Sequence, residues 1–383
     1  MGAALNDTAT PVRPADRVDS IDVVRGVALY GVMAINLLTS FRASIFQQFL
    51  PRVAAPGAAD RMTDAIAYYG LDMKAFSLFS FLFGVGLAIQ YERLSRHGSP
   101  LYWLSRRLAV LLVFGLIHIL FIWNGDVLTE YALAGFVVLP LLMTRVWVVG
   151  ISMGACLVFY TLMPVLDLPI PWPDQHGFEQ LVAAGNLAYG HGSFMQEHRF
   201  SFHEVADIVP LHLSVFPRTV GLFLLGVLSW RAGLFTAPYE NCARIAALAV
   251  VLTSLGVVLT HADGRMTGRI GAPILALGYC ATVVWLVEFT PLRSLLTAFA
   301  PLGRMAFSNY ITESLIFGVL FFGYGLGLYG RVGSTITLLL GTTVYVVQML
   351  ASAWWLRRYR FGPLEWLWRS LMYGRRQPFS RGA

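Results

Sequence analysis

Residues 146–166 read VWVVGISMGACLVFYTLMPVL, a run of 21 residues without a charged side chain. A helix needs roughly 20 mostly apolar residues to cross the roughly 30 Å of hydrocarbon in a bilayer. In that medium every backbone polar group must find a partner within the chain, which a helix provides inside a single segment. The stretch therefore predicts a transmembrane helix and places the chain among membrane proteins.

Similar apolar stretches lie on both sides of this one along the chain. Together they predict ten spans, at about 23–41, 74–91, 104–123, 127–144, 146–166, 211–230, 243–261, 270–289, 304–325 and 334–356. The sequence thus predicts an all-α, polytopic membrane protein with about ten transmembrane helices.

The composition agrees with this class and excludes several others. Of the 383 residues, 57% are hydrophobic and 13% are charged, whereas soluble domains carry about 25% charged residues. The 26 Phe, 16 Tyr and 10 Trp supply too much apolar surface for a disordered chain. The three cysteines are too few and too scattered for a disulfide framework, and no spacing suggests a metal site. The basic residues lie between apolar runs rather than on one soluble face, so we expect no nucleic-acid partner.

The placement of the basic residues predicts the orientation. With both termini in the cytoplasm, 19 of the 28 Lys and Arg residues fall on the cytoplasmic side and nine fall outside or within spans. This bias is the one that the positive-inside rule describes. An even number of spans also places both termini on one side. We therefore expect a multi-pass protein of the bacterial inner membrane with cytoplasmic termini.

The spans divide the chain into segments. These are a polar cytoplasmic tail 1–20, a five-helix half 21–166, an outer loop 167–210, a second five-helix half 211–374 and a basic tail 375–383. A polar loop as long as 167–210 is usually functional or disordered, and we expect one or two surface helices in it. Residues 361–374, FGPLEWLWRSLMYG, place their leucines and Trp368 on one helical face and predict a C-terminal interfacial helix.

Placing a polar side chain inside the hydrocarbon core of a membrane costs free energy. Each polar residue within a span is therefore a candidate site residue. Asp22 and Arg25 lie one turn apart at the cytoplasmic mouth of the first span. They form either a simple helix-end pair or a foothold for a ligand that carries phosphate or carboxylate. Asn36 lies 14 residues further on, which is about 21 Å deeper at 1.5 Å per residue.

A histidine in the third span lies at nearly the depth of Asn36. His118 is followed by Asp126 at the outer mouth, in HILFIWNGD. A neutral imidazole beside a carboxylate can act as a general base on a hydroxyl or amine. We therefore assign His118, Asn36 and Asp126 as candidate catalytic residues. The alternative is a buried histidine that a helix carbonyl satisfies.

Three further polar residues lie several positions inside the later spans. Arg218 lies in the span 211–230, and Asn309 and Glu313 belong to a polar stripe in GRMAFSNYITESLI, residues 303–316. With Asp22 and Arg25 they are the candidate substrate-binding residues. For the stripe, polar contacts between helices are the alternative.

Five blocks of the sequence carry a resemblance to a known family. They are RVDSIDVVRGVALYGVMAINLL (17–38), KAFSLFSFLFGVGLAIQYERLSRHG (74–98), RRLAVLLVFGLIHILFIWNGDVLTEYALAG (106–135), GRMAFSNYITESLI (303–316) and FGPLEWLWRSLMYG (361–374). In this order they resemble the YeiB-like family of bacterial inner-membrane proteins, a domain of unknown function. The likeness extends over nearly the whole chain.

The first block also resembles the opening helix of a wider superfamily of multi-pass acyltransferases. That helix carries Asp-x-x-Arg-Gly and a polar residue near its end, and Asp22, Arg25, Gly26 and Asn36 match it. In the branch of sugar O-acyltransferases the last position is commonly His. The branch of the lysosomal N-acetyltransferase has Asn there, but its catalytic histidine follows in a loop, and residues 37–73 contain no histidine. His118 would have to take that role from another helix.

Three hypotheses about function follow. The first is a membrane acyltransferase that passes an acyl group from a cytoplasmic donor, with acyl-CoA expected, to an envelope glycan or lipid. The second is a transporter or exporter, which intramembrane charges and glycine-rich helices suit equally well. The third is a receptor-like or scaffold protein without chemistry. In each case the bilayer is a partner, and we expect neither a metal nor a tightly bound cofactor.

Overall fold

The computed structural model describes residues 19–51, 57–96, 98–166, 168–235, 240–262 and 264–381, and every regular element in this part is a helix. The expected tail 1–20 lies outside the described residues up to position 18. The α-helices are α1 (Asp19–Asn36), α2 (Ala58–Ile66), α3 (Lys74–Ser95), α4 (Pro100–Phe121), α5 (Leu128–Val138), α6 (Val146–Leu162), α7 (Gln175–His191), α8 (Phe194–Arg231), α9 (Cys242–His261), α10 (Arg265–Phe289), α11 (Arg293–Leu296), α12 (Ala300–Arg304), α13 (Ala306–Phe321), α14 (Ser334–Arg358) and α15 (Pro363–Tyr373).

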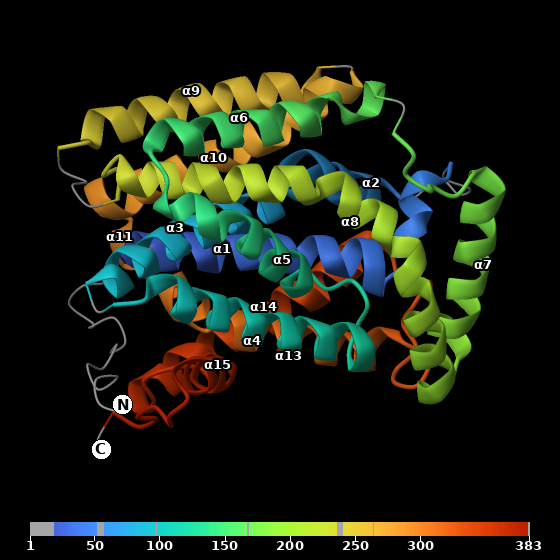
Figure 1. Cartoon of the computed structure of the whole chain (residues 1–383). Helices are drawn as coiled ribbons and strands as arrows, with labels where there is room; N and C mark the ends of the chain where they lie inside the picture. Colours follow the sequence, from blue (N-terminus) through green and yellow to red (C-terminus); the bar gives the residue numbers. More distant parts are fainter. Residues whose placement is uncertain are drawn as a thin grey trace.

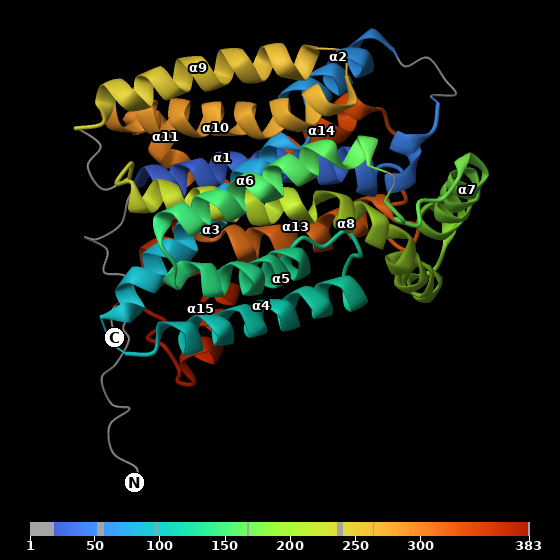
Figure 2. The ribbon, with the colours of Figure 1, turned by 45° about the horizontal axis from the view of Figure 1, so that its top comes forward.

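The expected spans correspond to a bundle of long helices that lie side by side (Figure 1, Figure 2). Within the described part, eight helices are long and apolar enough to cross a membrane. The other two expected spans, 127–144 and 304–325, coincide with the shorter apolar helices Leu128–Met143 and Ala306–Phe321. In the first, Pro140 removes a backbone donor and the chain continues as a 3₁₀ turn. The all-α polytopic fold predicted from the sequence is confirmed.

Helix α1 lies at the centre of the bundle and other helices lie at its edge. Of the most apolar window of α1, 83% is buried, whereas the figure is 17% for α6 and for α9. Helix α1 contacts α3, α10, α12, α13 and α14. The apolar side chains that α6 and α9 leave exposed are those that a bilayer would cover.

The polar segment 167–210 contains helices, as expected, but one of them extends beyond the expected loop. Helix α7 crosses one end of the bundle (Figure 1), but residues 194–210 form the first part of α8, which continues without a break to Arg231. A capping box at Ser193 and Gln196 starts α8. The carboxyls of Glu197 and Glu204 turn inward and are buried. At these two positions polarity therefore marks a buried helix face and not a loop.

The expected interfacial helix is α15, which packs against α4 and α13 at the end of the bundle opposite α7. Trp368 Nε1 donates to the Arg107 carbonyl oxygen at 3.0 Å. Glu365 accepts from the amides of Phe307 and Ser308 at 2.9 and 3.0 Å. Burial raises the pKa of the Glu365 carboxyl, and these hydrogen bonds oppose that effect. Helix α15 is thus fixed to the start of α13.

Helices α3 and α8 approach closely at Gly84 and Gly226. A Cβ atom at Gly226 would lie 2.2 Å from the Phe81 carbonyl oxygen, whereas one at Gly154 in α6 would meet nothing within 4 Å. Overpacking of this kind typically costs about 1–3 kcal/mol. We expect Gly226→Val to lower the melting temperature in detergent and Gly154→Val to change it much less, although both carry the same cost in helix propensity. Equal shifts for the two variants would contradict this packing.

Candidate functional site

Two cavities lie end to end in the core of the bundle. The first, which we call the arginine cavity, has a volume of about 330 Å³. Residues of α1, α3, α4, α5, α8, α12, α13, α14 and α15 line it. The second, which we call the histidine cavity, has a volume of about 110 Å³. Phe76, Val127 and Tyr131 line both. These three residues form the partition between the cavities.

The arginine cavity is strongly cationic. Its lining includes five arginines and two acidic residues, namely Arg25, Arg107, Arg304, Arg360, Arg369, Asp22 and Glu365. Arg25 Nη1 lies 3.2 Å from Asp22 Oδ1, so the one-turn pair expected from the sequence is formed. Arg25 also faces the cavity, which is what a foothold for an anion requires. Guanidinium groups suit phosphate and carboxylate ligands.

One of these arginines keeps an unused donor. Arg107 stacks on Trp368, with its guanidinium carbon 4.1 Å from the ring centroid. Its Nε is buried and makes no hydrogen bond within the described residues. A buried N–H without a partner is costly, and a polar ligand group would remove that cost.

The part of the arginine cavity nearest the partition is apolar. Along α1, Arg25 is followed in the cavity lining by Leu29 and Val32, before Asn36 lines the histidine cavity. Leu82 of α3 and Leu111 of α4 also line the arginine cavity. The arrangement of a cationic mouth and an apolar interior fits a ligand with an anionic head and an apolar end group.

The histidine cavity collects acidic, basic and amide side chains. Asn36, Asp126 and Arg218, which the sequence singles out, all line it, together with Asp72, Glu130 and His212. The structure thus brings together predicted residues from α1, α8 and the loop before α5. In the described part of the chain, no group of three or more His, Cys, Asp or Glu is arranged to hold a metal ion.

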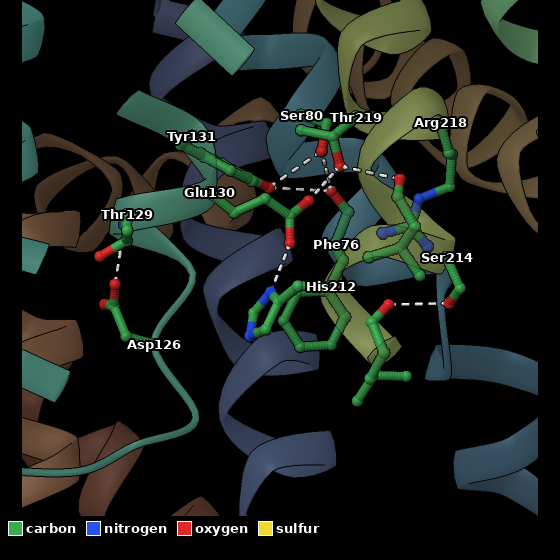
Figure 3. A network of polar contacts seen from close by, with 12 residues as sticks. Phe76, Ser80, Asp126, Thr129, Glu130, Tyr131, His212, Ser214, Arg218 and Thr219 are labelled. Atoms are coloured by element: carbon green, nitrogen blue, oxygen red, sulfur yellow. Dashed lines mark hydrogen bonds and ion pairs between the residues drawn. The ribbon is translucent and has the colours of Figure 1, made fainter. Parts of the chain in front are cut away.

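A network of hydrogen bonds converges on Glu130 (Figure 3). His212 Nδ1 lies 2.8 Å from Glu130 Oε2, and Thr219 Oγ1 donates to Glu130 Oε1 at 2.5 Å. The neighbouring Tyr131 hydroxyl donates to the Phe76 carbonyl oxygen at 3.1 Å. Glu130 thus forms a histidine–carboxylate pair in the second cavity, and the next residue in the chain, Tyr131, belongs to the partition.

His118 contacts Asp126, as the sequence suggested, but it lies behind the cavity wall. Its Nδ1 is 2.9 Å from Asp126 Oδ1 and its Nε2 is 3.0 Å from Ser314 Oγ. Its exposed fraction is 0%, and it lines neither cavity. Asp126 Oδ2 accepts the Thr129 amide at 2.7 Å. Both ring nitrogens of His118 are thus engaged, and the pair holds the first turn of α5.

Arg218 lies beside an unusual stretch of backbone. Met73 is the one described non-glycine residue with positive φ, at 59°, and its Sδ lies 2.9 Å from Arg218 Nη1. Asp72 is close enough to interact electrostatically with Arg218. Left-handed backbone at a bulky residue is strained and is typical of functional sites. Here it places Asp72 in the wall of the histidine cavity.

The remaining two predicted substrate-binding residues line neither cavity. Asn309 Nδ2 donates to Ser352 Oγ at 3.0 Å, and Gln348 Nε2 donates to the Asn309 carbonyl oxygen at 3.1 Å. Glu313 is 3% exposed on the same helix. These positions favour the alternative reading, in which the stripe connects α13 to α14.

Sequence reasoning missed His212 and its pairing with Glu130. His212 is the second residue of the expected span 211–230, so an inventory of ionisable groups in that span would have found it beside Arg218. In the sequence, Arg107, Arg360 and Arg369 contribute only to the predicted cytoplasmic charge. Nothing in the neighbouring sequence indicates that they line one cavity.

Comparison with known proteins gives a consistent result. A model described as "Protein of unknown function (DUF418)" matches residues 229–375. The chain is 32% identical to "Uncharacterized protein YxaH" of Bacillus subtilis (strain 168), over 97% of this chain and 98% of that protein. It is 28% identical to "Uncharacterized protein YeiB" of Escherichia coli (strain K12), over 93% of this chain and 96% of that protein. It is also 28% identical to an "Uncharacterized 39.9 kDa protein in amylase 3'region" of Bacillus acidopullulyticus, over 96% and 97%.

Proposed function

The chain belongs to the YeiB-like DUF418 family, and from its two cavities we propose that it is a membrane acyltransferase. In this proposal, acyl-CoA is the donor and enters the arginine cavity from the cytoplasm. The acyl group passes to a hydroxyl or amine of an envelope glycan or lipid in the histidine cavity. The protein would lie in the bacterial inner membrane with both termini in the cytoplasm.

The observation that carries the proposal is the shared wall of the two cavities. A donor in the arginine cavity and an acceptor in the histidine cavity would meet at Phe76, Val127 and Tyr131. Acyl transfer needs the two reactants within about 3–3.5 Å in a fixed orientation. Two pockets that share one wall bring both ligands to the same three side chains.

The chemistry of each cavity suits its proposed ligand. Acyl-CoA carries phosphates at one end and a thioester at the other, and the arginine cavity is lined by both arginines and apolar residues. The histidine cavity holds Asn36, Asp72 and Arg218, which can bind the polar groups of an acceptor. Its histidine–carboxylate pair supplies a proton acceptor.

The test uses a strain that lacks the gene, compared with its parent by untargeted mass spectrometry of lipids and glycans. We expect the deletion strain to lose one acyl substituent from an envelope component and to regain it when the gene is restored. A transporter would instead cause an unmodified compound to accumulate on one side of the membrane. That result, without any lost acyl group, would reject the enzyme and favour the exporter.

The orientation has its own test. A reporter fused after Ser380 should be active on the cytoplasmic side, and one inserted at residues 192–193, between α7 and α8, should be active on the outer side. This follows from the placement of 19 of the 28 basic residues at the cytoplasmic end. If both fusions report the same side, the number of spans between them is wrong by an odd number.

A further inference from the structure

We infer that His212 is the general base of the proposed reaction and that His118 is a positioning residue. This inference rests on the acyl transfer proposed above. It concerns which imidazole touches the acceptor, and it differs from the expectation drawn from the sequence.

The orientation of the His212 ring gives the first reason. Glu130 Oε2 lies 2.8 Å from Nδ1, and Glu130 Oε1 accepts the Thr219 hydroxyl. A carboxylate that accepts both hydrogen bonds places the imidazole proton on Nδ1. Nε2 then carries a lone pair, which is what a base requires. The arrangement of base and orienting carboxylate is the one that activates hydroxyl groups in many enzymes.

Access to the cavity gives the second reason. The His212 side chain is 34% exposed and lines the histidine cavity, and no hydrogen bond occupies its Nε2 among the described residues. The groups near it in the cavity wall are Glu130 and Asp126 from the α5 region, Asp72, and Arg218 of its own helix. A substrate hydroxyl placed among them can reach Nε2 directly.

His118 meets neither condition. Asp126 and Ser314 engage both of its ring nitrogens, and its exposed fraction is 0%. Asp126 in turn accepts the Thr129 amide at the start of α5, and Glu130 is the next residue. His118 therefore acts on the site through Asp126, by fixing the turn of helix that carries Glu130.

His212 alone can accept the proton of the acceptor and return it to the leaving group. The acceptor oxygen or nitrogen attacks the thioester carbonyl carbon of acyl-CoA, and its proton moves to His212 Nε2. The new C–O or C–N bond forms as the C–S bond breaks. The same proton then passes from Nε2 to the departing sulfur, which leaves as the free thiol. His212 returns to its neutral form, and no oxidant or metal is needed.

The experiment uses inverted membrane vesicles from the deletion strain, each carrying one variant, supplied with radiolabelled acetyl-CoA or palmitoyl-CoA. Label in envelope material is measured from pH 5 to 9. We expect His212→Gln to lower incorporation by about 10²–10⁴-fold, the usual contribution of a general base, and to remove the rise in rate through imidazole titration. His203→Gln, an exposed histidine on the same helix, is the control and should match wild type.

A second measurement separates the base from a folding defect. Binding of the same acyl-CoA should be unchanged in His212→Gln, since His212 does not line the arginine cavity. His118→Gln should lower the rate but keep the pH profile of wild type. If instead His212→Gln keeps the wild-type rate, or His118→Gln alone removes the pH dependence, the assignment is wrong. Failure of wild-type vesicles to incorporate label would reject the proposed function itself.

Discussion

Replacing Arg107 and Arg25 together by methionine is expected to weaken acyl-CoA binding by about 10²–10⁴-fold. Each arginine faces the same cavity, and Arg107 has an unused buried Nε. A hydrogen bond to a charged group is worth about 1.5–3 kcal/mol, which is about 10–150-fold for each residue. Methionine keeps much of the apolar stem, so the packing against Trp368 is largely preserved. Calorimetric titration of the protein in nanodiscs measures the effect.

A ligand without phosphates gives this prediction its control. Acyl-pantetheine has the thioester but no nucleotide, so wild type and the double variant should bind it equally. Arg96→Ala removes an exposed arginine at the same end of the bundle, outside the cavity, and should leave both affinities unchanged. An equal loss of affinity for both ligands would mean that the arginines support the fold and not the phosphates.

Closing the partition is expected to stop transfer without affecting donor binding. Val127 lines both cavities, and Val127→Phe would add a ring at the place where the reactants meet. A displacement of about 1 Å can cost 10²-fold in rate, so we expect incorporation of label to fall by about 10²-fold or more. Donor affinity should change by much less, because the arginines lie at the other end of their cavity.

The matched control is Val137→Phe. Val137 belongs to α5, the helix that begins directly after Val127, and it is 48% exposed on the surface, where a bilayer accepts a phenyl ring readily. The Val137→Phe variant should have the same transfer rate and the same expression level as wild type. If Val127→Phe also transfers at the wild-type rate, the acyl group does not pass through the partition.

Most of the fold could be predicted because membrane spans are encoded locally. Each run of about 20 apolar residues specifies a helix by itself, and all ten expected positions hold an apolar helix. The start of α8 at Phe194 could not be read this way. The segment that contains Glu197 and Glu204 has the composition of a solvated loop. Only the folded structure shows that these two side chains are buried.

The candidate site was only partly accessible from the sequence. His118 and Asp126 are eight residues apart, so their contact follows from one short connection between two spans. Glu130 and His212 are 82 positions apart, and their pairing depends on how α5 packs against α8. Depth along a span also does not specify which way a side chain faces. The sequence predicts nearly the same depth for Asn36 and His118, yet of the two only Asn36 lines the histidine cavity.

The central claim is that an acyl donor lies in the arginine cavity with its reactive end at the partition. The most direct measurement is a cryo-electron microscopy structure of the protein in nanodiscs with a thioether analogue of acyl-CoA, which cannot be cleaved. We predict phosphate density beside Arg25 and Arg107 and the acyl end at Tyr131. Analogue density on another surface, or an arginine cavity filled by helix α15 while the analogue binds elsewhere, would contradict it.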